Sequence, residues 1–156
     1  MPSITTREYN PTTGAFVSNI SSLSYGRIIV GTHSPVKVID FAFTGVSSVS
    51  NVKLGLMDSG GVAVNPSPQD VTSDGSASNG NFGCMHSLQF STQTSQGPLT
   101  RHYAGLNASG LASDTKNIKI GQRSDVVSQF VYLDMELGSN DVGQAAGLYK
   151  VFFDFE

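Results

Sequence analysis

The stretch Pro35–Phe43, PVKVIDFAF, follows a Ser-Pro pair and is apolar on both of its alternating sides. Its only charged residues are Lys37 and Asp40. Successive side chains of a β-strand point to opposite faces of the sheet, so a strand that is covered on both faces reads as an almost continuous apolar run. The stretch therefore predicts a strand that is buried on two faces.

Further strand patterns occur on both sides of this stretch. In Asn51–Met57, NVKLGLM, apolar residues alternate with a second set of positions, which indicates one apolar face. The face formed by Val52, Leu54 and Leu56 is opposite Lys53, Gly55 and Met57. Shorter candidate strands lie at Tyr25–Gly31, Ser87–Thr92, Pro98–Gly105 and Asn117–Gln122.

The last third of the chain contains two longer alternating segments, Gln129–Leu137 and Gly147–Glu156. The first segment places Val131, Leu133, Met135 and Leu137 opposite Phe130, Tyr132, Asp134 and Glu136. The second places Tyr149, Val151, Phe153 and Phe155 opposite Lys150, Phe152, Asp154 and Glu156. A Gly-rich loop joins the two segments, so we expect an antiparallel hairpin with one aromatic and aliphatic face and one acidic face.

These patterns add up to about eight short strands separated by turn signals, and no amphipathic helix of useful length is visible. We therefore predict an all-β fold, either an antiparallel β-sandwich or a jelly-roll-like barrel. Residues 1–24 are polar with sparse apolar positions, and we interpret them as an extended N-terminal arm. A disordered terminus or one early strand are the alternatives. Residues 25–156 are then a single β-sandwich domain.

The composition argues against several partners. Only 13% of the residues are charged, the net charge is −3, and the nine basic residues are scattered along the chain. A nucleic-acid surface needs concentrated positive charge, so we expect no nucleic-acid partner. No apolar run approaches the roughly 20 residues that span a bilayer, so we expect no membrane partner. A single cysteine excludes an internal disulfide.

The stretch Thr72–His86, TSDGSASNGNFGCMH, holds the residue types of a metal or nucleophile site. Asp74 is its only carboxylate, and a calcium loop needs more negatively charged ligands than one. Cys84 and His86 supply too few zinc ligands, and on a strand they would point the same way without hydrogen-bond contact. We interpret the stretch as a surface loop that runs into a strand, and we expect no metal and no cofactor.

Four carboxylates offer the other route to catalysis. Asp134 and Glu136 share one predicted strand face, and Asp154 and Glu156 could lie on a neighbouring strand. Cross-strand geometry allows the spacing of a glycosidase pair, but the solvated outer face of a sheet explains the same alternation. Nucleophile-elbow, P-loop and dinucleotide-binding motifs do not occur. We therefore do not expect an enzyme.

Several runs of sequence carry a resemblance to a known class of proteins. They are Ser34–Gly61, Ser73–Gly83, Leu99–Asn107, Val131–Gly138 and Leu148–Glu156. Over about Val36–Glu156 the chain resembles capsid decoration, or cement, proteins and related auxiliary head proteins of tailed bacteriophages. The resemblance is one of texture and strand order, and no residue-level site comes with it.

The resemblance implies a non-enzymatic virion structural protein that binds the outside of a phage capsid and stabilises it. It implies the major capsid protein as partner, a homo-oligomer with a trimer favoured, and a location on the outer capsid surface after synthesis in the host cytoplasm. Apolar residues of the arm and aromatic residues opposite the predicted core are the candidate contacts. These are Ile4, Tyr9, Phe16, Ile20, Leu23, Phe130, Tyr132 and Phe152.

Two other functions remain open. One is a receptor- or carbohydrate-binding β-sandwich, such as a tail-fibre or adhesion module, in which exposed aromatic rings stack on sugars. The chain has no Trp, which weakens that interpretation. The other is a hydrolase that uses Asp134 with Glu136, or Cys84 with His86.

Overall fold

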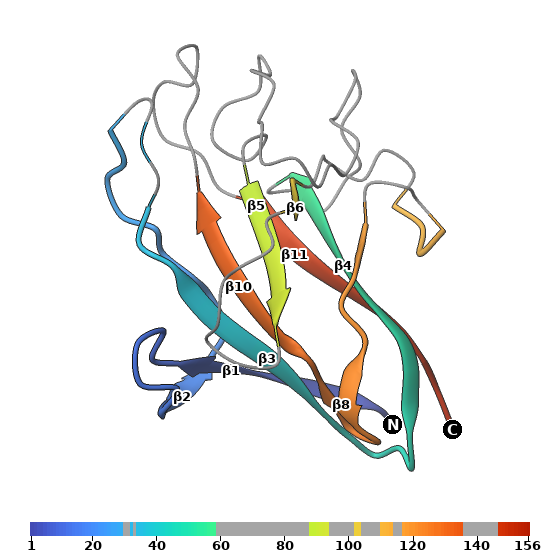
Figure 1. The fold of residues 1–156 in the computed structure, drawn as a ribbon. Coiled ribbons are helices and arrows are strands. Elements are labelled where there is room, and N and C mark those ends of the chain that lie inside the picture. The colour runs from blue at the N-terminus through green and yellow to red at the C-terminus, as the bar shows by residue number, and fades with distance from the viewer. Residues whose placement is uncertain are drawn as a thin grey trace.

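The computed structural model describes residues 1–29, 32, 34–58, 88–93, 102–103, 110–113, 117–135 and 147–156. Within these residues the chain forms eleven β-strands and no helix, and every strand pair is antiparallel (Figure 1). The predicted all-β antiparallel fold is confirmed.

The larger of the two sheets has the strand order β2-β1-β3-β10-β5-β6. Its path consists of β1 (Ser3–Tyr9), β2 (Phe16–Ile20), β3 (Lys37–Thr44), β5 (Leu88–Gln93), β6 (His102–Tyr103) and β10 (Phe130–Met135). Two short strands, β8 (Gln122–Ser124) and β9 (Val127–Ser128), pair with each other, and β9 also pairs with β3. The predicted buried strand is thus β3, between β1 and β10.

The smaller sheet has the order β11-β4-β7. It consists of β4 (Val49–Asp58), β7 (Ile118–Lys119) and β11 (Gly147–Phe155). The two sheets share one hydrophobic core, to which β3, β10, β4 and β7 all contribute, and Figure 1 shows β4 and β11 running side by side as a second layer. This arrangement is consistent with a β-sandwich. The core contains Ile39, Phe41, Phe43, Val49, Val52, Leu54, Leu56, Ile118, Ile120, Val131 and Leu133.

The strand β3 is buried on both faces, as its sequence predicts. Ile39 and Phe41 enter the core between the sheets, whereas Val38 and Asp40 alternate with them and are also buried. In β4, the predicted core face of Val52, Leu54 and Leu56 is confirmed. Two strand predictions thus hold together with the faces that they assigned.

The predicted hairpin of the last third is wrong. The strand β10 pairs with β3 and β5 in the larger sheet, whereas β11 pairs with β4 in the smaller one. Each strand does have an apolar side that packs in or against the core, but the two lie in different layers. An alternating pattern fixes which face of a strand is buried and leaves its pairing partner open.

The predicted strand at Tyr25–Gly31 is also not formed over its described residues. Residues 25–29 have no strand pairing, and Tyr25 and Ile28 pack against the core as parts of an irregular segment. Burial of these side chains accounts for the apolar run without a strand.

Residues 1–24 are not an extended arm in this structure. All seven residues of β1 are in register with β3, from Ser3 opposite Thr44 to Tyr9 opposite Val38. The strand β2 then returns along β1 after a turn that is closed by Asn10. The backbone of this segment gains ladder hydrogen bonds, and Ile20 and Leu23 pack against the core. The alternative of an early strand therefore describes residues 1–24 better than an arm, whereas the division of the chain into domains stays a prediction.

Candidate functional site: a buried aspartate beneath an arginine and aromatic surface

Asp40, in the middle of β3, has no exposed surface although its side chain is ionisable. Its neighbours Ile39 and Phe41 face the core, so the carboxylate lies on the opposite side of the larger sheet. A buried carboxylate is costly unless it is paired and hydrogen-bonded. The surroundings of Asp40 therefore decide whether this strand is stable.

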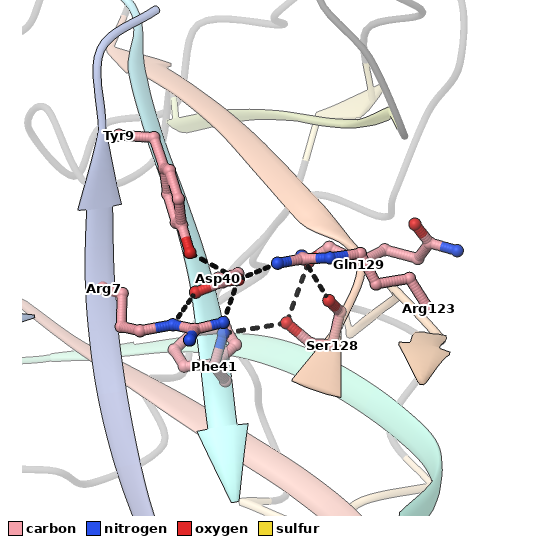
Figure 2. Close-up of polar contacts among 7 residues, drawn as sticks. All are labelled: Arg7, Tyr9, Asp40, Phe41, Arg123, Ser128 and Gln129. Atoms are coloured by element: carbon pink, nitrogen blue, oxygen red, sulfur yellow. Dashed lines mark hydrogen bonds and ion pairs between the residues drawn. The ribbon is translucent and has the colours of Figure 1, made fainter. Parts of the chain in front are cut away.

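Two arginines and a tyrosine supply the partners of this carboxylate, and Figure 2 shows the arginines approaching it from opposite sides. Arg7, directly opposite on β1, donates from Nε to Oδ1 at 2.8 Å and from Nη2 to Oδ2 at 2.7 Å. Arg123 of β8 donates from Nη2 to Oδ2 at 2.5 Å, and the Tyr9 hydroxyl donates to the same oxygen at 3.2 Å. The bidentate geometry of Arg7 is the strong form of such a pair.

A second set of hydrogen bonds fastens β8 and β9 onto β3. The Nη1 atom of Arg123 donates to the carbonyl oxygen of Ser128 at 2.8 Å. The Ser128 hydroxyl oxygen accepts from the backbone N–H of Phe41 at 2.9 Å (Figure 2). Asp40 and Ser128 together therefore join three segments that are far apart in the sequence.

Aromatic rings extend this network to the molecular surface. The Tyr9 ring lies 5.0 Å from Phe130 and 5.9 Å from Phe16 between centroids, and both pairs meet edge to face. The Arg123 guanidinium lies 3.8 Å from the centroid of Phe130, within cation–π distance. The Phe16 side chain is more than half exposed. We call Arg7, Tyr9, Phe16, Arg123 and Phe130 the Arg–aromatic surface.

Two groups of this surface, Arg7 and Tyr9, hold their protons more firmly than usual. The hydrogen bond to Asp40 raises the pKa of Arg7, although burial opposes that shift. Burial raises the pKa of the Tyr9 hydroxyl, and the Asp40 carboxylate raises it further. Two guanidinium charges and one carboxylate leave a net charge of +1 on a chain whose total is −3.

The structure gathers some of the predicted contact residues and separates others. Tyr9, Phe16 and Phe130 meet in the Arg–aromatic surface. Ile4 is partly exposed at the start of β1, and Tyr132 is buried at 5% exposure. Phe152 lies on β11 in the other sheet, opposite Lys53. The remaining two, Ile20 and Leu23, pack against the core.

The arginines and the aspartate of the network were absent from the predicted site. The signal for it in the sequence is Asp40, a carboxylate in the middle of a largely apolar strand. Arg7 and Arg123 are 33 and 83 residues away from Asp40 in the chain, so local patterns could not connect them.

Of the four candidate catalytic carboxylates, Asp134 and Asp154 do not share a face. Asp134 is buried on β10 in the larger sheet, whereas Asp154 is exposed on β11 in the smaller sheet. Within the described part of the chain, no three His, Cys, Asp or Glu side chains converge as metal ligands. Thr72–His86, with Cys84 and His86, lies outside the described residues, as do Glu136 and most of the loop before β11.

The described residues also include no helix of the length and apolarity needed to cross a membrane. Comparisons of the chain with protein-family models, with curated proteins and with solved structures found no match.

Proposed function

We propose that this chain is a non-enzymatic structural protein of a phage virion, which binds the outside of the capsid and stabilises it, and that it contacts the capsid through the Arg–aromatic surface. The class comes from the resemblance in the sequence. The choice of surface comes from the geometry, and the observation that carries it is that one buried aspartate holds two partly exposed arginines and a tyrosine whose ring packs on two further aromatic rings.

The composition of the surface favours protein contact. Aromatic residues and arginine are enriched in protein interfaces, and truncation of tyrosine or arginine there often causes the largest losses of affinity. Arg7 and Arg123 are each about a quarter exposed, at 26% and 28%, while Asp40 holds one end of each guanidinium. Side chains that are already ordered lose less entropy when a partner docks, so a small preorganised surface can bind usefully.

Repetition compensates for the small area. A capsid offers many copies of the same binding site, and a homo-oligomer, with a trimer favoured, would engage several of them together. The major capsid protein is the proposed partner. Each single contact can then be weak while the assembled layer binds firmly.

The proposal is tested with capsid shells from the virus that encodes the chain, prepared without this protein. Sedimentation of shells with added protein should show saturable binding, and the bound shells should resist heat better than bare shells. Phe16→Ala should weaken binding about tenfold, because a contact of this kind is worth about 1–2 kcal/mol. Phe155→Ala is the matched control, since Phe155 is similarly exposed, at 54% against 57%, but lies on the other sheet.

Failure of the unaltered protein to bind bare shells, or binding without added heat resistance, would remove the proposed function. Equal losses from Phe16→Ala and Phe155→Ala would leave the class standing and refute the choice of surface.

A further inference from the structure

A second surface feature, independent of the capsid proposal, lies on the outer face of the smaller sheet. A groove of about 500 Å³ crosses β4, β7 and β11 there, and Ala112 lines it from the neighbouring turn. The turn is fastened in place because the Asn117 side chain donates to the carbonyl oxygens of Leu111 and Ala112 at 3.0 and 3.4 Å. A volume of this size suits one or two sugar rings or a comparable small ligand.

Positive charge gathers on this face. Lys53 of β4 and Lys119 of β7 are directly opposite each other in the strand register, and both line the groove. Lys150 of β11 lies on the same side of the sheet, because it is opposite Gly55, two residues along β4 from Lys53. Like charges on adjacent strands are unfavourable unless something compensates for them.

The neighbouring groups do not neutralise these lysines. Lys53 donates to the carbonyl oxygen of Ala112 at 3.0 Å, and Lys150 donates to that of Gly110 at 3.3 Å. Across the described part of the chain, the side chain of Lys119 makes no hydrogen bond or ion pair, and the residue is exposed. Among the residues that line the groove, Lys53 and Lys119 outweigh the one acid, Asp154, which leaves a net charge of +1, and Lys150 adds a further positive charge on the same face.

Polar acceptors and a ring complete the lining. The Asn51 amide nitrogen donates to Oδ2 of Asp154 at 2.6 Å. In that geometry the amide oxygen of Asn51 and Oδ1 of Asp154 are further acceptors beside the groove. Phe152, half-buried and opposite Lys53, contributes an aromatic ring.

The backbone at Asn51 is in an unusual conformation that serves this arrangement. Asn51 has a φ of 51°, and the register between β4 and β11 shifts beside it. Such bulges redirect side chains, and residues in this region of φ often mark binding sites. Here the bulge brings Asn51 and Asp154 together at the groove.

This combination of groups matches an acidic sugar. Cations attract a carboxylate, paired amide and carboxylate groups bind hydroxyls, and an aromatic ring packs against the apolar face of a sugar ring. An acidic peptide fits less well, because its carboxylates would meet that of Asp154 and it offers no row of hydroxyls for Asn51 and Asp154. A nucleic acid needs a longer track of positive charge than three lysines.

We propose that the groove binds an acidic carbohydrate, a short hexuronic-acid segment. Its carboxylate lies between Lys53 and Lys119, its ring packs on Phe152, and its hydroxyls bind Asn51 and Asp154. Recognition of a negatively charged glycan is then a binding activity of this chain in addition to any role in a virion.

The test is an NMR titration of the full chain with a hexuronic-acid trisaccharide. The matched ligand is the same trisaccharide with its carboxyl groups reduced to alcohols. Saturable chemical-shift changes in β4, β7 and β11 are expected with the acidic trisaccharide and not with the reduced one. The affinity should fall as the salt concentration is raised. Lys119→Gln should weaken binding about fivefold, in line with a partly exposed charge pair. Lys37→Gln, on the larger sheet, is the control and should leave binding unchanged.

A ring-removing variant, Phe152→Leu, and an acidic peptide as a competing ligand test the proposal further. Phe152→Leu retains apolar volume without the ring and should abolish most of the saturable shift, while the rest of the spectrum stays that of the folded protein. Equal binding of the acidic and reduced sugars, equal losses from Lys119→Gln and Lys37→Gln, tighter binding of a Glu-rich decapeptide, or no shift at all would each overturn the proposal.

Discussion

At the scale of single residues, Asp40 shows how one charge can organise a surface. Its burial would oppose folding if the carboxylate were alone, since an unpaired buried charge is far more costly than a paired one. Four hydrogen bonds from three side chains on β1 and β8 offset that cost. The same bonds fix the directions of Arg7, Tyr9 and Arg123. Stability and surface geometry therefore depend on the same carboxylate.

Asp40→Asn should accordingly be strongly destabilising. The amide keeps the size of the side chain but removes the charge and turns an acceptor oxygen into a donor that faces two guanidinium groups. We expect a loss of about 3 kcal/mol in the free energy of unfolding, measured by urea denaturation. Glu8→Gln is the control, because Glu8 is partly exposed and lies 3.8 Å from Lys37, a pair worth less than about 1 kcal/mol. Similar losses in the two variants would show that the Asp40 network contributes little.

At the scale of elements, the start of the N-terminal strand is placed by a close backbone contact. Beside its first residue, Gly45 follows β3 with a φ of 76°, and a Cβ atom there would lie 2.5 Å from the carbonyl oxygen of Met1. Backbone cannot move aside as easily as the end of a side chain. The start of β1 and the end of β3 therefore fit together only with glycine at this position.

Gly45→Ala and Gly26→Ala form a matched pair that separates backbone strain from this close approach. Gly26 has a similar φ of 69°, but a Cβ atom there would meet open space. Gly26→Ala should lower the free energy of unfolding by about 1 kcal/mol through strain alone. Gly45→Ala should cost at least about 1 kcal/mol more, as overpacking does, and should speed hydrogen exchange in β1. Equal stabilities and equal exchange rates in the two variants would contradict the tight fit.

The same scale explains what could be predicted from sequence. The two-sided burial of β3 and the core face of β4 follow from alternation of nearby residues, and both predictions are confirmed. Met57, on the other face of β4, is buried as well. The pairing of β10 and β11 does not follow, because either strand could bury its apolar side in the same core from opposite layers. The polar pattern of residues 1–24 does not predict their two strands, because β1 is stabilised by distant residues. These contacts are the ladder with β3 and the Arg7–Asp40 pair.

The candidate sites were harder to predict for the same reason. The aromatic residues Tyr9, Phe16 and Phe130 were visible as candidates, but the distant strands that bring them together were not. The outer face of β11 was expected to be acidic beside β10. Its true neighbour, β4, brings Lys53 instead, and β7 on the far side of β4 brings Lys119. A wrong partner strand thus reversed the predicted charge of a whole surface.

At the scale of the whole molecule, a half-buried pair of tyrosines joins the irregular segment before β3 to the last strand. The hydroxyl oxygens of Tyr25 and Tyr149 lie 2.6 Å apart, and both side chains pack against the core between the sheets. Burial raises the pKa of Tyr25 well above its ordinary range, and the neighbouring Tyr149 raises it further. Folding therefore keeps the proton on this hydroxyl.

That linkage makes the fold sensitive to alkali. Below the ordinary tyrosine pKa of about 10, Tyr25 is protonated in both the folded and the unfolded chain, so its contribution to stability is fully present. Above that pH the unfolded chain releases the proton while the folded chain retains it. The free energy of unfolding should then fall by about 1.4 kcal/mol per pH unit for this tyrosine, until the folded protein itself ionises or unfolds.

Denaturation by urea at pH values from 8 to about 11.5, a range that spans the ordinary tyrosine pKa, checks this expectation. Tyr25→Phe should lose about 1 kcal/mol at pH 8, because one hydrogen bond is removed. Its stability should then decline less steeply with pH, so that the curves of the variant and the unaltered protein converge or cross in alkali. Absorbance at 295 nm should show at least one tyrosine that ionises only as the chain unfolds. If every tyrosine instead titrates near pH 10 in the folded protein, the Tyr25 hydroxyl is accessible to solvent there. That result would contradict the packing of Tyr25 against Tyr149 and the core between the sheets.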